Sequence, residues 1–141
     1  MNIERLVPSI ADVFAESSYR YHVLVVDDLS PDGTADAVRS MQQRYSWLLL
    51  ITGQKAGLGA AYVRGISWAL ENLAPDVVFQ MDADFSHKPE DLPRLLLEVE
   101  RGADFVIGSR YAPGGKVPEN WSVLRRMNSL VGNMVARYVA D

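Results

Sequence analysis

Four short apolar runs restrict the possible folds of this sequence more than any other feature. They cover residues 22–26, 47–51, 77–81 and 105–107. Each has the length and composition of a buried strand. The segments between them, and residues 2–16 before the first, repeat apolar residues at helical spacing. Strands that alternate with helices predict a single α/β domain over residues 1–141, with a mostly parallel sheet.

Helices are also expected after the apolar runs. One begins near Thr34, where Asp32 or Thr34 can cap it, a second runs to about Leu73, Pro89 starts a third, and residues 122–140 form the last.

Carboxylates follow two of the expected strands: Asp27 with Asp28, and Asp82 with Asp84. Parallel strands bring both groups to the edge where open α/β sheets bind ligands. In an extended chain Asp82 and Asp84 point to the same side. Oxygen ligands without a nearby Cys suit Mg²⁺ or Mn²⁺, which bridge to substrate phosphates. The alternative is a strand-end loop with two solvated aspartates.

Two arginines add positive charge near this edge. Arg110 follows the fourth apolar run, and Arg125 lies in the first turn of the last expected helix. A guanidinium and the free N–H groups of a helix start both favour anions. A salt bridge to one of the aspartates explains Arg110 almost equally well. Taken together, these residues predict a metal-diphosphate site beside an anion site.

Composition and motif spacing exclude several other functions. The net charge of −4 argues against a nucleic-acid partner, and the absence of Cys excludes disulfides and thiolate zinc sites. Tyr62 stands where a dinucleotide fingerprint requires its third Gly, and no Ser, Cys or His has the context of a nucleophile. For His22 and His87 we expect packing or capping roles. No apolar run could span a bilayer, so we expect any membrane contact to be peripheral.

Four ordered motifs carry a family resemblance. They are VVDDLSPDGT at residues 25–34, GLGAAYVRG at 57–65, MDADFSHKP at 81–89 and GSRYAPGG at 108–115. This series resembles the polyprenyl-phosphate (dolichol-phosphate) mannose synthases, inverting glycosyltransferases of family 2. The resemblance implies a GT-A (nucleotide-diphospho-sugar transferase) fold, which is a Rossmann-like, mostly parallel sheet flanked by helices.

The resemblance also implies roles for individual residues. Val26 and Asp28 would contact the guanine nucleotide of GDP-mannose, and Asp82, Ala83 and Asp84 would hold the donor. Asp84 and Ser86 would bind Mg²⁺ or Mn²⁺. Arg110 would contact both substrates, and Arg125, or Arg126 in its place, would bind the lipid phosphate with Ser129. Asp84 and Arg110 are therefore the expected catalytic residues.

The implied reaction transfers mannose from GDP-mannose to a polyprenyl phosphate, with inversion, at the cytoplasmic face of a membrane. Because the acceptor phosphate is already anionic, no general base is needed. Alternatives are a polyprenyl-phosphate glucosyltransferase or another family 2 enzyme that uses a UDP-sugar, and a truncated, inactive fragment that binds nucleotide. Relatives begin with another strand and continue beyond residue 141. We therefore expect that the first strand and the C-terminal part are missing. The expected consequences are low stability and low activity of the isolated chain, or pairing with a partner chain or a membrane subunit.

Overall fold

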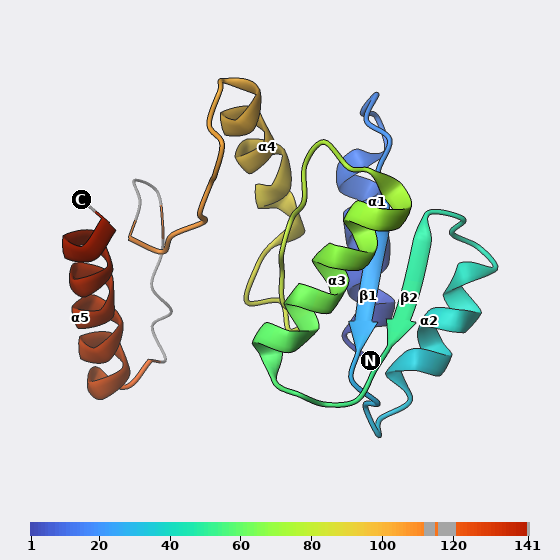
Figure 1. Cartoon of the computed structure of the whole chain (residues 1–141), viewed down its shortest axis with the longest axis horizontal. Helices are drawn as coiled ribbons and strands as arrows, with labels where there is room; N and C mark the ends of the chain where they lie inside the picture. The colour runs from blue at the N-terminus through green and yellow to red at the C-terminus, as the bar shows by residue number, and fades with distance from the viewer. Residues whose placement is uncertain (112–114, 116–120, 141) are drawn as a thin grey trace. The chain divides into compact units, whose positions relative to one another are not determined.

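Two compact units, Met1–Leu97 and Glu98–Asp141, make up the chain in the computed structural model (Figure 1). The structure describes residues 1–111, 115 and 121–140, without the side chains of residues 125, 126, 136, 137, 139 and 140.

The first unit is built on two parallel strands. Strand β1 (Val23–Asp27) pairs with β2 (Leu48–Thr52) in a register that places Val23 opposite Leu48 and Asp27 opposite Thr52. The helical elements are α1 (Ile3–Phe14), α2 (Thr34–Gln42), α3 (Leu58–Leu73), the 3₁₀ turn η1 (Pro89–Asp91) and α4 (Leu92–Glu100), which runs into the second unit. These elements confirm the α/β class and the helices expected in this part of the chain.

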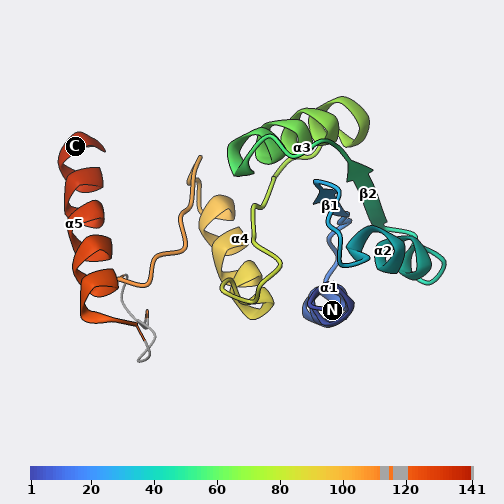
Figure 2. The same cartoon turned by 90° about the horizontal axis from the view of Figure 1, so that it is seen from below.

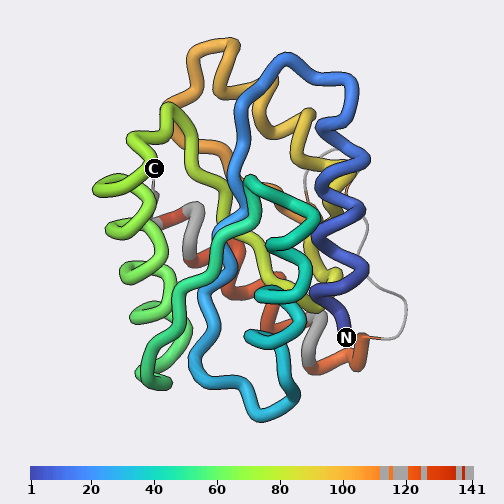
Figure 3. The backbone as a smooth tube through the Cα atoms, turned by 90° about the vertical axis from the view of Figure 1, so that its right-hand side faces the viewer, coloured from blue at the N-terminus to red at the C-terminus, as the bar shows by residue number. Residues whose placement is uncertain are grey.

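Helices cover both faces of the two strands. Figure 2 shows α1 and α2 below the strands and α3 above them, and Figure 3 shows α1 and α3 on opposite sides. Because successive strand residues point to opposite faces, Val23 and Val25 pack toward the α1 and α2 cluster, whereas Val26 faces α3. Helices α1 and α2 bury Val7 and Val38 there, both fully enclosed. The sheet is thus the middle layer of three.

Two of the expected strands are not formed. Residues 77–81 and 105–107 pair with no strand in the described part of the chain. A strand is held by hydrogen bonds to a neighbour, and apolar content alone cannot supply them. The side chains of Phe105 and Ile107 remain 81% and 72% exposed. The prediction of a larger sheet was therefore wrong for these segments.

The second unit contains α5 (Val123–Ala140), which confirms the last expected helix. Among the residues that the structure describes, no helix has both the length and the apolar content needed to cross a membrane.

Helix α3 approaches β1 closely at Gly65. A Cβ atom added there would lie 2.8 Å from Cγ2 of Val26. Valine is stiff at χ1, so this methyl group can retreat little. We expect Gly65→Ala to lower the free energy of unfolding by about 1–2 kcal/mol, since overpacking outweighs the gain in helix propensity. Urea denaturation measures this change.

Gly132→Ala is the matched control, because its added Cβ would meet nothing within 4 Å. Equal stability of the two variants would contradict the close approach of α3 to β1.

Candidate functional site

The two aspartates after β1 have different surroundings. Asp27 is only 4% exposed, and its Oδ2 accepts a hydrogen bond from the backbone N–H of Ser30 at 3.1 Å. Its carbonyl accepts the N–H of Gly53 at 3.0 Å, which continues the ladder beyond the last strand pair. These contacts give Asp27 a structural role in shaping the turn.

Asp28 faces the opposite side of the sheet and meets α3. Its Oδ1 accepts a hydrogen bond from Nη2 of Arg64, and the two side chains form a partly buried ion pair. Val26, two residues earlier, lies against Gly65 of the same helix. The two residues expected to contact the nucleotide therefore lie on one face, as strand alternation requires.

Helix α3 also contacts the second carboxylate segment. The Tyr62 hydroxyl donates a hydrogen bond to Oδ1 of Asp82 at 2.7 Å. This bond, with burial, raises the pKa of Tyr62 from 10.0 to about 12. The Asp82 N–H donates to Nδ1 of His87 at 3.1 Å, so this histidine satisfies a backbone donor within its own loop. Asp82 is thus held through both its backbone and its side chain.

Asp84 lies in a turn. The extended geometry expected between Asp82 and Asp84 was wrong, because the turn begins at Ala83. Oδ1 of Asp84 accepts the Ser86 N–H at 2.8 Å. Hydrogen bonds from the hydroxyl and then the backbone of Ser86 lower the pKa of Asp84, which favours its carboxylate form. Phe85 between them has a φ of 62°, a left-handed conformation that non-glycine residues rarely adopt.

Asp84 and Ser86 offer a sparse ligand set for a metal ion. Both residues are exposed, and their oxygens lie within one turn. Within the described residues, no group of three or more His, Asp or Glu side chains could hold a metal. An exposed carboxylate and a hydroxyl fit a Mg²⁺ or Mn²⁺ ion that keeps several waters and takes further ligands from a substrate diphosphate.

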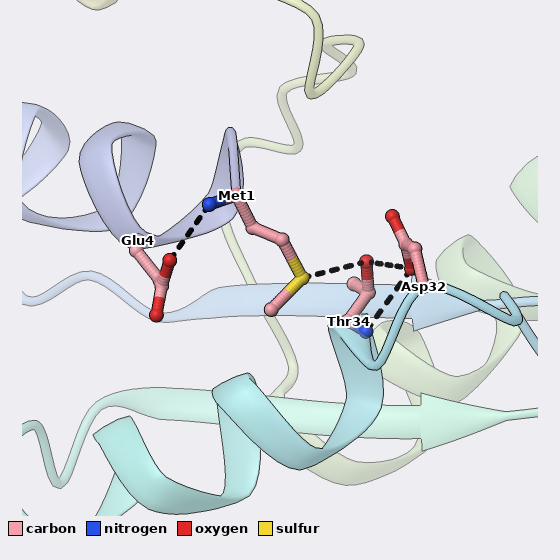
Figure 4. A network of polar contacts seen from close by, with 4 residues as sticks. All are labelled: Met1, Glu4, Asp32 and Thr34. Carbon is pink, nitrogen blue, oxygen red and sulfur yellow. Dashed lines mark hydrogen bonds and ion pairs between the residues drawn. The ribbon is translucent and has the colours of Figure 1, made fainter.

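Ala83 lines an open cavity of about 340 Å³. Its other lining residues are Met1, Asn2, Ile3, Asp32 and Thr34. Figure 4 shows Asp32 accepting hydrogen bonds from the hydroxyl and the backbone N–H of Thr34, at 2.7 and 3.1 Å. These bonds, the hydroxyl's first, lower the pKa of Asp32. The N-cap of α2 is Gly33 and not Asp32 or Thr34 as expected, although Asp32 accepts the first N–H of the helix. The cavity therefore joins the turns that follow two apolar runs.

The expected anion-binding residues belong to the second unit. The guanidinium of Arg110 lies 4.9 Å from the ring centroid of Trp121, within the range of a cation–π contact. Ser129 is half-buried on α5. The backbones of Arg125 and Arg126 are part of α5, and their side chains lie outside the described residues.

The sequence analysis assigned no role to Arg64 and considered Tyr62 only as a departure from the dinucleotide fingerprint, although Tyr62 also lies on the apolar face of the expected helix. A signal existed for Tyr62, since a phenol on an apolar face needs a partner for its hydroxyl. Nothing in the spacing pointed to Arg64, because its partner Asp28 is distant in the sequence.

Comparison with known proteins identifies the family. The model of the family described as "Glycosyl transferase family 2" matches residues 2–138, so the chain belongs to this family. An undecaprenyl-phosphate mannosyltransferase of Micrococcus luteus is 52% identical over 116 residues, 82% of this chain and 46% of the relative.

Two further relatives have related names. A polyprenol monophosphomannose synthase of Mycolicibacterium smegmatis is 47% identical over 84% of this chain and 44% of its own length. A dolichol-phosphate mannosyltransferase of Pyrococcus furiosus is 38% identical over 96% of this chain and 37% of its own length. The chain thus spans less than half the length of these curated relatives.

The bond between Tyr62 and Asp82 has a consequence at high pH. Because the folded chain raises the pKa of Tyr62 to about 12, the bond stabilises the fold fully below pH 10 and loses this effect as pH rises through 12. We expect Tyr62→Phe and wild type to have nearly equal phenolate absorbance at about pH 11, since Tyr62 is still protonated there.

Unfolding in urea should then release one additional phenolate in wild type alone. The hydrogen bond to Asp82 is contradicted if, at this pH, folded Tyr62→Phe has lower phenolate absorbance than folded wild type by the amount of one tyrosine.

Proposed function

We propose that this protein transfers mannose from GDP-mannose to a polyprenyl phosphate and forms a β-linked mannosyl phosphate. The observation that carries the proposal is the 52% and 47% identity to two relatives named as mannose-transferring enzymes of polyprenyl phosphates. The arrangement of acidic side chains around α3 supports it, since such a site suits a sugar nucleotide bound with a divalent cation.

The donor site in this proposal lies at the C-terminal end of β1. Val26 and Asp28 contact the nucleotide, and Asp82, Ala83 and Asp84 hold the diphosphate and the sugar. The fixed orientation of Asp82 by Tyr62 supports this placement. A carboxylate that is already oriented before the ligand binds loses little conformational freedom on binding, so more of the interaction energy contributes to affinity.

Asp84 and Ser86 are the proposed ligands of Mg²⁺ or Mn²⁺. The lowered pKa of Asp84 supports this role, because the ionised carboxylate is the form that binds a cation. When bound, the ion would neutralise negative charge on the departing diphosphate. Asp84 itself holds no proton for the reaction, and the anionic acceptor needs no base to activate it.

Arg110, Arg125 and Ser129 are proposed to bind the acceptor phosphate, with Arg126 as the alternative to Arg125. Two anionic substrates repel each other, and guanidinium groups that bind the acceptor phosphate offset this repulsion and orient its attacking oxygen. Attack from the side opposite the diphosphate inverts the configuration. The acceptor lipid implies action at a membrane surface, which we propose to be the cytoplasmic face, with the protein bound peripherally.

The metal role is tested by Asp84→Asn. Loss of the charge should lower mannosyl transfer at least about 100-fold and weaken Mn²⁺ binding in the presence of GDP-mannose. Transfer of labelled mannose to polyprenyl phosphate and calorimetric titration measure the two effects. Asp36→Asn, on the exposed surface of α2, is the control and should behave as wild type.

Undiminished transfer by Asp84→Asn would refute the metal role. Titration of the wild type with UDP-glucose in place of GDP-mannose tests the identity of the donor. Tighter binding of UDP-glucose would contradict mannose transfer and favour glucose transfer as the reaction.

The acceptor role is tested by Arg110→Ala. We expect the KM for polyprenyl phosphate to rise about tenfold or more, because a charge-assisted contact to phosphate is lost. Arg101→Ala removes an exposed arginine whose ion pair, within the described residues, is with Glu98 one turn away, and its steady-state kinetics should match wild type. An unchanged KM for the lipid in Arg110→Ala would exclude this arginine from the acceptor site.

A further inference from the structure

The ion pair between Asp28 and Arg64 occupies a space that one glycine leaves open. Gly53 follows β2 directly, and its N–H bonds to the carbonyl of Asp27, so the ladder puts Gly53 beside Asp28. A Cβ atom on Gly53 would lie 2.5 Å from Cζ of Arg64, 2.6 Å from Nη1 and 2.8 Å from Nε. The guanidinium therefore lies against the backbone of Gly53.

Backbone conformation does not explain the glycine. The φ angle of Gly53 is not positive, so a residue with a side chain could adopt this φ. The missing side chain matters instead for the guanidinium, because any Cβ would collide with it. Gly53 thus leaves the space that the guanidinium of Arg64 occupies.

In the described part of the chain, the carboxylate of Asp28 is the one that holds the guanidinium against Gly53. The Nε atom is buried and has no hydrogen-bond partner within the described part of the chain. The ion pair found there for Arg64 is with Asp28 through Nη2. Since a buried donor without a partner is costly, the close pairing with Asp28 must compensate for this arrangement.

We propose that Arg64, whose guanidinium packs against Gly53, is a positioning residue. It orients the Asp28 carboxylate so that this carboxylate can recognise the nucleotide base. The inference rests on the proposed function, in which Asp28 contacts the guanine nucleotide. Arg64 engages Oδ1 of Asp28, and among the described residues this leaves Oδ2 as the acceptor for N–H groups of a base. A carboxylate restrained in one rotamer presents this acceptor in a fixed direction, and a base that offers N–H donors gains affinity.

Calorimetric titration with GDP and Mn²⁺ tests the proposal in the full chain. Arg64→Ala and Gly53→Ala should each weaken GDP binding by roughly tenfold, the loss typical for removal of a partner from a charged hydrogen bond. Arg64→Lys should recover part of the affinity, because the charge remains but the planar fork is lost. Gly132→Ala is the matched control for Gly53→Ala, since its Cβ would meet nothing within 4 Å.

A double-mutant comparison separates positioning from a general structural effect. In an Asp28→Asn background, Arg64→Ala and Gly53→Ala should cause little further loss of GDP affinity, and the urea midpoints of Arg64→Ala and Asp28→Asn should be non-additive. GDP affinity in Gly53→Ala equal to that of Gly132→Ala, or fully additive urea midpoints, would overturn the proposal.

The same measurements distinguish this proposal from the proposed function. If the wild type binds no GDP while the urea midpoints remain non-additive, the nucleotide role of the whole site fails and Arg64 and Asp28 form a purely structural pair. If the wild type binds GDP and the midpoints are additive, only the positioning role of Arg64 fails.

Discussion

The parallel pairing of β1 with β2 is the constraint on which the candidate site depends. Its register continues past the strands through the bond from Gly53 to the carbonyl of Asp27, so the chain turns away at one common edge. Helix α3 lies over the same strands and brings Tyr62 and Arg64 to that edge. The strand pairing and the packing of α3 fix the relative positions of whole backbone segments. They therefore bring together side chains that are far apart in the sequence.

Four aspartates of similar appearance in the sequence have four different environments. Asp27 is buried in its own turn, Asp28 is paired with a guanidinium, Asp82 accepts a phenol hydrogen bond, and Asp84 is exposed with its oxygens directed at one turn. Charge that is already neutralised by a cation attracts a second cation weakly, whereas an exposed carboxylate keeps its full affinity. This difference supports the separate roles proposed for Asp28 in binding a base and for Asp84 in binding a metal ion.

Backbone strain accompanies both acidic turns. Leu29 follows Asp28 with a φ of 57°, and Phe85 follows Asp84 with a φ of 62°. Such left-handed conformations cost about 1–3 kcal/mol for a non-glycine residue and persist where the surroundings enforce them. Phe85 packs against the cluster around α1 and α4, and the guanidinium of Arg5 lies 5.2 Å from its ring centroid. Packing of the aromatic ring thus stabilises a turn that the backbone alone disfavours.

The sequence by itself determined the α/β class, the helices and the resemblance to a transferase family, because apolar periodicity and short motifs are local properties. It also identified the acidic residues, since apolar runs followed by carboxylates are visible in the chain. It could not predict that residues 77–81 would remain unpaired, because a strand requires a neighbour that periodicity does not reveal. Only the tertiary structure decided that Arg64 meets Asp28 and Tyr62 meets Asp82, since these contacts depend on how α3 packs across the strands.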